Sequence, residues 1–72
     1  MTILIENADT LEYLAKDGRW SKKVTDALTY RTSTLAREHG VTVPVARFNV
    51  VGVFKNSPQM VNLDEGVGAG SK

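Results

Sequence analysis

The sequence predicts an α+β domain: a small antiparallel sheet of about four strands, with one or two short helices packed on one face. Runs of β-branched and aromatic residues stand at both ends of the chain, and helix-compatible residues lie between them. Clusters of turn residues separate these segments. The predicted order is β-β-α-α-β-β, with residues 1–63 as a single domain and residues 64–72 as a flexible tail.

The first fifteen residues are typical of a β-hairpin. Residues 3–5 are apolar and β-prone, residues 7–9 form a turn cluster, and β-compatible residues resume at 11–14. Asp17 and Gly18 are expected to end the hairpin, because glycine tolerates the positive φ that a tight reversal demands.

Residues 21–40 are expected to contain the helices. Ser21 is a good N-cap, and the apolar residues at 24, 27 and 28 fit one face of a short helix. The three hydroxyl residues at 32–34 favour a break, with a new helix that begins at Thr32 or Ser33, while a single helix over 22–38 is the alternative. Gly40 is expected to end the helix in the usual C-terminal position.

Residues 46–54 form the clearest strand. Its first half is apolar on one side, whereas its second half is apolar on both sides, so we expect it to be central in the sheet or to form an interface. Val51 and Val53 are therefore the candidate interface residues. A turn is predicted at 55–58, and a returning strand at 59–63.

Composition limits the kinds of site that the chain can hold. It has 72 residues and no cysteine, which excludes disulfides and thiolate metal sites, and His39 is its one histidine. A domain of this size buries only about 60% of its unfolded surface and often gains stability by oligomerisation, so a homodimer is a reasonable expectation. The start of the chain has no basic leader and no stretch is apolar enough to span a membrane, which predicts a cytoplasmic protein without membrane partners.

The residue types needed for catalysis are poorly represented. His39 is expected at a helix C-terminus, where an imidazole interacts with the helix dipole. Metal-binding motifs are missing, and the glycines of residues 66–70 are followed by no helix that could complete a phosphate loop. The sequence therefore predicts a protein that is not an enzyme and that has no cofactor and no bound metal.

Charge is unevenly distributed along the chain. The net charge is −3 over residues 1–15, +5 over residues 16–55 and −1 over residues 56–72. In the basic middle, cations alternate with aromatic residues, a pattern that suits phosphate neutralisation combined with base stacking. The same aromatic residues could form the core, with the cations as a solvated rim, and the pI of about 8.1 is low for a nucleic-acid-binding domain. The candidate residues for binding a partner or phosphate are Arg19, Trp20, Lys22, Lys23, Arg31 and Arg47.

The segment from Leu11 to Ala36 contains a spaced pattern. Its members are Tyr13-Leu14, then Asp17-Gly18-Arg19-Trp20, then Ala27, Tyr30 and the residues 32–36. This pattern resembles one that recurs in small uncharacterised proteins of bacteriophages and prophages. The resemblance covers about half of the chain and implies a compact α+β module of viral origin. It also implies a host-takeover or anti-defence role, by covering a surface of a host enzyme or sequestering a signalling nucleotide in the bacterial cell.

These observations lead to three hypotheses. The first is a non-enzymatic binding module, encoded by a phage, that binds and inhibits or redirects a host protein. The alternative is a nucleic-acid or nucleotide-binding protein that uses the basic and aromatic middle segment. The second alternative is a minor structural protein of the virion.

Overall fold

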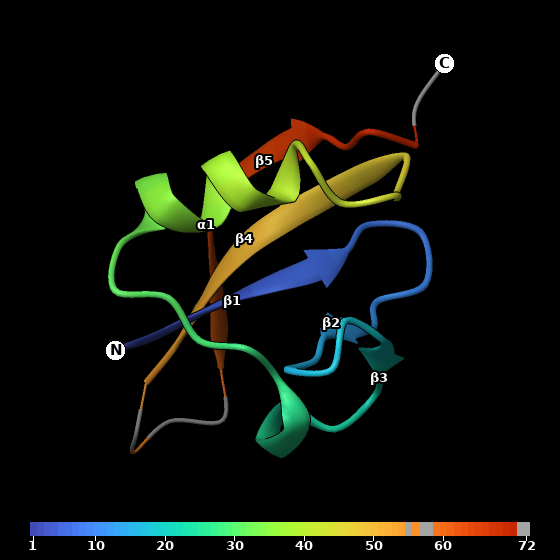
Figure 1. The fold of residues 1–72 in the computed structure, drawn as a ribbon. Helices are drawn as coiled ribbons and strands as arrows, with labels where there is room; N and C mark the ends of the chain where they lie inside the picture. The colour runs from blue at the N-terminus through green and yellow to red at the C-terminus, as the bar shows by residue number, and fades with distance from the viewer. Residues whose placement is uncertain (55, 57–58, 71–72) are drawn as a thin grey trace.

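The computed structural model describes residues 1–54, 56 and 59–70, and it has the predicted α+β fold. Five strands form one antiparallel sheet in the order β3-β2-β1-β4-β5, with helix α1 packed over one face (Figure 1). The sheet has one strand more than expected, because the short segment after the Gly18 turn pairs with β2. The elements are β1 (Thr2–Asn7), β2 (Tyr13–Leu14), β3 (Trp20–Ser21), the 3-10 turn η1 (Val24–Asp26), α1 (Ser33–Gly40), β4 (Arg47–Val53) and β5 (Met60–Val67).

The predicted hairpin and its turns are present. β1 pairs with β2, and the Asn7 side chain accepts hydrogen bonds from the backbone N–H groups of Asp9 and Thr10 at 2.9 and 3.2 Å. Leu11 closes this loop with a φ of 62°, in the left-handed region. Gly18 has a φ of 83°, which explains why glycine stands at the reversal between β2 and β3.

The helix predicted after Ser21 is only a 3-10 turn, and this corrects the prediction. Ser21 does not cap it: its Oγ accepts from the N–H of Lys23 at 3.1 Å and donates to Asp26 at 3.0 Å. The residues that would continue the helix instead follow the sheet. Ala27 forms a bridge with Ala15, and Leu28 donates its N–H to the carbonyl of Leu14 at 2.8 Å. Sheet pairing thus outweighs the weak helical pattern.

The break between the two helical segments lies where the hydroxyl residues predicted it. Helix α1 begins at Ser33, and the Oγ1 of Thr32 accepts from the N–H of Leu35 at 3.1 Å. The role expected of Gly40 is different in the structure. Gly40 is the last helical residue and has no positive φ, but a Cβ there would lie 2.5 Å from the ring of Phe48. Close packing, and not turn geometry, requires this glycine.

The main core lies between α1 and the sheet. Phe48, at its centre, is completely buried and lies between two glycines, Gly40 and Gly66. The other members of this core are Ile3, Ile5, Leu14, Ala36, Val43, Val45 and Val50, with Trp20, Tyr30 and Leu63 packed at its border. Since Trp20 and Tyr30 contact this core, they are framework residues as well as surface ones.

Strand β4 is central in the sheet, which explains its apolar residues on both faces. It lies between β1 and β5, and Val51 joins a second, smaller cluster with Leu4 and Ala27 on the face away from α1. β5 carries one extra residue where the register shifts, because Val50 pairs with Asp64 whereas Val51 pairs with Asn62. This bulge places Leu63 against the main core.

The segment predicted as a loose tail from Asp64 onward is ordered as far as Gly70, a further correction. β5 continues to Val67, and Gly68 and Gly70 then donate their N–H groups to the carbonyls of Ala46 and Val45 at 3.0 and 3.2 Å. These glycines permit close backbone contact with the preceding loop, since a Cβ on Gly70 would meet the Val45 nitrogen at 2.9 Å. Residues 71–72 of the predicted tail, and residues 55, 57 and 58 of the predicted turn, lie outside the described residues.

Candidate functional site

The two faces of the sheet differ in what covers them. Helix α1 packs on one face (Figure 1), and on the other face Ala27, which follows η1, packs against Leu4 and Val51. We call this second surface the open face, formed by Thr2, Leu4, Glu6, Tyr13, Ser21, Arg47, Asn49, Val51, Val53, Met60, Asn62, Glu65 and Val67. The strand register defines it, because residues directly opposite each other in neighbouring strands share a face.

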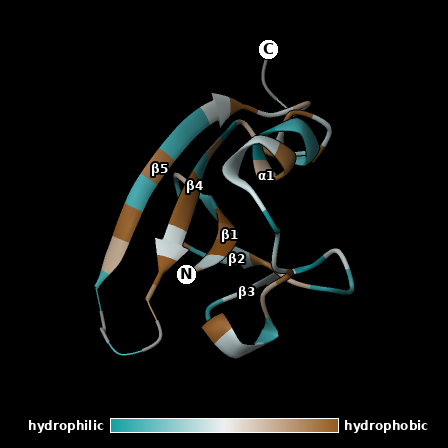
Figure 2. Cartoon of the chain, turned by 90° about the vertical axis from the view of Figure 1, so that its left-hand side faces the viewer, coloured by the Kyte–Doolittle hydropathy of each residue, from teal (hydrophilic) through white to brown (hydrophobic). Residues whose placement is uncertain are grey.

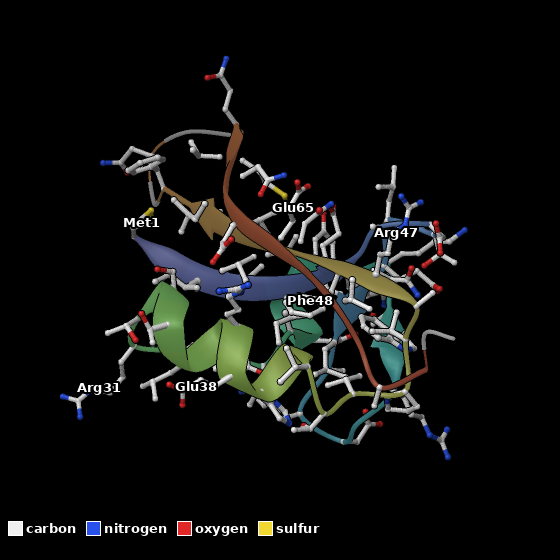
Figure 3. All side chains as sticks on the ribbon, turned by 90° about the horizontal axis from the view of Figure 1, so that it is seen from above. Met1, Arg31, Glu38, Arg47, Phe48 and Glu65 are labelled. Atoms are coloured by element: carbon white, nitrogen blue, oxygen red, sulfur yellow. The ribbon has the colours of Figure 1, made fainter. Side chains whose placement is uncertain are left out.

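A polar row crosses the open face from β1 to β5. Glu6 lies opposite Asn49, and Asn49 lies opposite Glu65. The side-chain amide of Asn49 donates to Glu6 at 3.1 Å, which holds both groups in place. Figure 3 shows Glu65 on the side of the sheet away from α1. Asn49, Glu65 and Arg47 also line a hollow of about 570 Å³, which extends to Arg37 and Val41 at the end of α1.

An apolar area adjoins this row. The ring of Tyr13 packs on the Leu4 and Val51 cluster, and its hydroxyl donates to the sulfur of Met60 at 3.3 Å. The side chain of Tyr13 therefore reaches across the face from β2 to β5. Burial, and to a smaller extent the negative charge of Glu6, raise the pKa of the Tyr13 phenol. The phenol thus stays a neutral hydrogen-bond donor throughout the physiological pH range.

The two candidate interface residues have different positions. Val51 is 4% exposed and belongs to the second cluster, so its side chain is covered within the chain itself. Val53 is half-buried beside it and lies opposite Met60. Met60 of β5 is 36% exposed, and Val67, at the other end of the same strand, is 58% exposed. The accessible apolar surface of the open face is thus mainly on β5, which sequence reasoning did not single out. Val61 lies opposite Gly52 and so belongs to the α1 face.

The structure brings together four of the six basic and aromatic candidates. Arg19 and Trp20, with Lys22 and Lys23 directly after β3, lie at the β3 edge of the sheet. A hollow of about 520 Å³ opens beside Trp20, lined by Ala15, Lys16, Asp17, Arg19, Trp20, Ser21, Thr25 and Asp26. Its two carboxylates offset its two cations, which weakens any field that would attract phosphate.

The other two candidates lie elsewhere. Arg31 precedes α1 and points away from the chain, and Figure 3 shows it on the opposite side of the molecule from Arg47. Arg47 forms an ion pair with Asp9, with Nη2 and Oδ1 3.0 Å apart. The six residues therefore do not form one continuous basic surface.

His39, in the last turn of α1, shares a hydrogen bond through Nδ1 with the hydroxyl of Tyr30. Tyr30 is tied to the sheet in turn, because its N–H donates to the carbonyl of Ile3 at 2.9 Å. Burial raises the pKa of Tyr30 to about 12, so its hydroxyl keeps its proton and the contact joins the helix to β1.

Within the described ranges, no group of three or more His, Asp or Glu side chains could hold a metal ion. Over the same ranges, no helix is long and apolar enough to cross a membrane. The glycines of residues 66–70 lie at the end of β5 and against the loop before β4, where their backbone contacts the chain itself.

Comparison of the chain with protein-family models, with curated proteins and with solved structures found no match.

The acidic ends of the sequence are the signal that could have located the open face. The first segment contributes Glu6 and the last contributes Glu65, and the central strand brings them to either side of Asn49. The row could not be recognised from the sequence, because its residues are far apart in the chain and only strand pairing places them on one surface.

Proposed function

We propose that this chain is a non-enzymatic binding module that covers a surface of a host protein with the open face of its sheet and so inhibits or redirects that protein. The observation that carries the proposal is the pairing of partly exposed apolar side chains with a polar row on the sheet face away from α1: Met60 is 36% exposed, and Tyr13 and Val53 are half-buried beside it. An apolar centre within a polar rim is the usual anatomy of a protein interface. The host partner and the phage origin rest on the resemblance of the Leu11–Ala36 pattern to small phage proteins.

Two residues of β5 make the proposal specific. Met60 contacts the Tyr13 hydroxyl and is exposed at the apolar area, whereas Glu65 is exposed at the polar row. A partner seated on this face would bury both. Aromatic residues and methionine are enriched in such interfaces, and Tyr13 and Met60 provide both types here.

The test is capture of partners from a bacterial lysate by the immobilised chain, with and without nuclease. The variant Met60→Lys places a charge in the apolar area, and Leu35→Lys makes the same change on α1, where Leu35 is 47% exposed. We expect a protein that is retained after nuclease treatment, is kept by Leu35→Lys and binds Met60→Lys at least about tenfold more weakly. Equal binding by both variants would contradict the use of the open face.

Nucleic-acid or nucleotide binding is the second candidate, favoured by one observation. Arg19, Lys22 and Lys23 are gathered around the half-buried Trp20 at the β3 edge. Stacking of a base on Trp20 would quench its fluorescence, and phosphate contacts would make the affinity fall steeply with salt. Titration with a single-stranded oligonucleotide at low salt tests this directly. Quenching that is absent at low salt would exclude this candidate.

A further inference from the structure

The two free edges of the sheet carry opposite charge. β3 and β5 are the outermost strands, so each exposes one row of backbone groups that is not paired within the sheet. Around β3, the four exposed cations Lys16, Arg19, Lys22 and Lys23 outnumber the exposed carboxylates Asp17 and Asp26, so residues 16–26 carry a net charge of +2. β5 carries Asp64 and Glu65. In Figure 2, β5 is seen as the outer strand at the left of the sheet.

At the β5 edge, one of the two carboxylates is free to interact with another molecule. Asp64 is engaged within the chain, since its Oδ2 lies 3.5 Å from Nε of Arg37 and its Oδ1 accepts from the N–H of Glu65 at 2.8 Å. Glu65 itself is exposed, and no ion pair engages it among the residues that the structure describes. Its charge is therefore available to a cation on another molecule.

This distribution discriminates between the ways in which two copies could meet. Like charges on facing strands repel. Pairing β5 with β5 would bring two acidic strands together, and pairing β3 with β3 would bring two sets of flanking cations together, so both arrangements are unfavourable. Only β3 against β5 juxtaposes opposite charges. We propose that this chain associates with itself head to tail, with the β3 edge of one copy docking on the β5 edge of the next.

Such a contact has two consequences. It uses different surfaces of the two partners, so association continues to further copies in an open chain or closes as a ring, and it does not stop at a symmetric dimer. Because Asp64 already occupies the N–H of Glu65, side-chain charge and not a full backbone ladder drives the contact. The association is therefore sensitive to salt, since charges are screened over about 30 Å at 0.01 M but about 3 Å at 1 M.

Charge reversal at each edge tests the proposal. The double variant Lys22→Glu/Lys23→Glu changes the net charge of residues 16–26 from +2 to −2. Glu65→Lys replaces the free carboxylate of β5 by a cation, since Asp64 is engaged by Arg37. The control Arg31→Glu reverses a charge at an exposed position before α1, away from both edges (Figure 3). Far-UV circular dichroism establishes that each variant keeps the fold, and sedimentation velocity gives its mass as a function of concentration and salt.

We expect the unaltered chain and the control to associate at low salt beyond two copies and to dissociate to monomers at high salt. Each edge variant alone should remain monomeric at low salt. An equal mixture of Lys22→Glu/Lys23→Glu and Glu65→Lys should recover the association, because their altered edges attract each other. Trp20, within β3, should change its fluorescence on association. A monomer at low salt, a dimer that survives high salt, equal loss in the control or no recovery in the mixture would each overturn the proposal.

Discussion

The space around Phe48 gives a quantitative test of how the core is built. A Cβ added by Gly40→Ala would lie 2.5 Å from Cε2 and Cζ of the Phe48 ring, well inside the roughly 3.5 Å at which carbon atoms begin to attract. The ring cannot move away freely, because it also packs directly against Gly66 of β5. The contact is so close that a Cβ added to Gly66 would lie 2.6 Å from Cζ of the ring. Overpacking of a core typically costs about 1–3 kcal/mol.

Helix propensity acts in the opposite direction. Replacing glycine by alanine inside a helix is favourable by about 1 kcal/mol, less at a helix end. The steric cost should prevail, so we expect Gly40→Ala to lower the free energy of unfolding by about 1–2 kcal/mol. For a domain of this size that corresponds to a fall in Tm of about 4–16 °C. Urea unfolding followed by Trp20 fluorescence and thermal unfolding followed by circular dichroism measure both quantities.

A double-mutant cycle separates the two effects. Phe48→Leu removes the ring that the new methyl group would meet, so Gly40→Ala should cost less in that background, with a coupling energy of about 0.5–3 kcal/mol. Gly18→Ala is a useful comparison, because Gly18 has a φ of 83° and open space around it, and its cost should be independent of Phe48. If Gly40→Ala left Tm unchanged or raised it, the packing argument would be wrong.

Three further predictions concern single positions. The pKa of Tyr30 is raised to about 12, so its contribution to stability is fully present below about pH 10 and is lost as the pH rises towards 12; Tyr30→Phe should flatten this part of the pH dependence of urea unfolding. Thr32→Ala removes the acceptor of the Leu35 N–H and should cost about 1 kcal/mol in urea unfolding, whereas Thr32→Ser keeps the cap and most of the stability. Leu11 has a φ of 62°, so Leu11→Gly should relieve about 1–2 kcal/mol of backbone strain in the folded state. The greater freedom of the unfolded chain offsets about 0.4–1 kcal/mol of this gain, so Tm should rise, and a lower Tm would contradict the prediction.

The features predicted correctly are those that depend on neighbours in sequence. The turn at Gly18, the helix start at Thr32 and the strand around Val50 all follow from local chemistry, namely a positive φ, a side-chain cap and a β-branched run. The features predicted wrongly depend on distant contacts. Ala27 leaves the expected helix because it bridges Ala15, and Gly68 is ordered because it bonds to Ala46.

The candidate site shows the same division. The grouping of Arg19, Lys22 and Lys23 was predictable, since they are close in sequence. The ion pair that joins Arg47 to Asp9 was not, because it connects β4 to the loop after β1. Val51 was singled out for its place in a strand that is apolar on both sides, and the structure shows that the second cluster covers it.

The sequence by itself determined the fold class, the main turns and the uneven charge of the chain, because propensity, capping and composition act over a few residues. Only the tertiary structure decided which glycines make room for Phe48 and how far β5 extends. It also decided that Glu6 and Glu65 flank Asn49 on the sheet face away from α1. Strand pairing is the physical reason, since it places on one surface residues that lie more than forty positions apart in the chain.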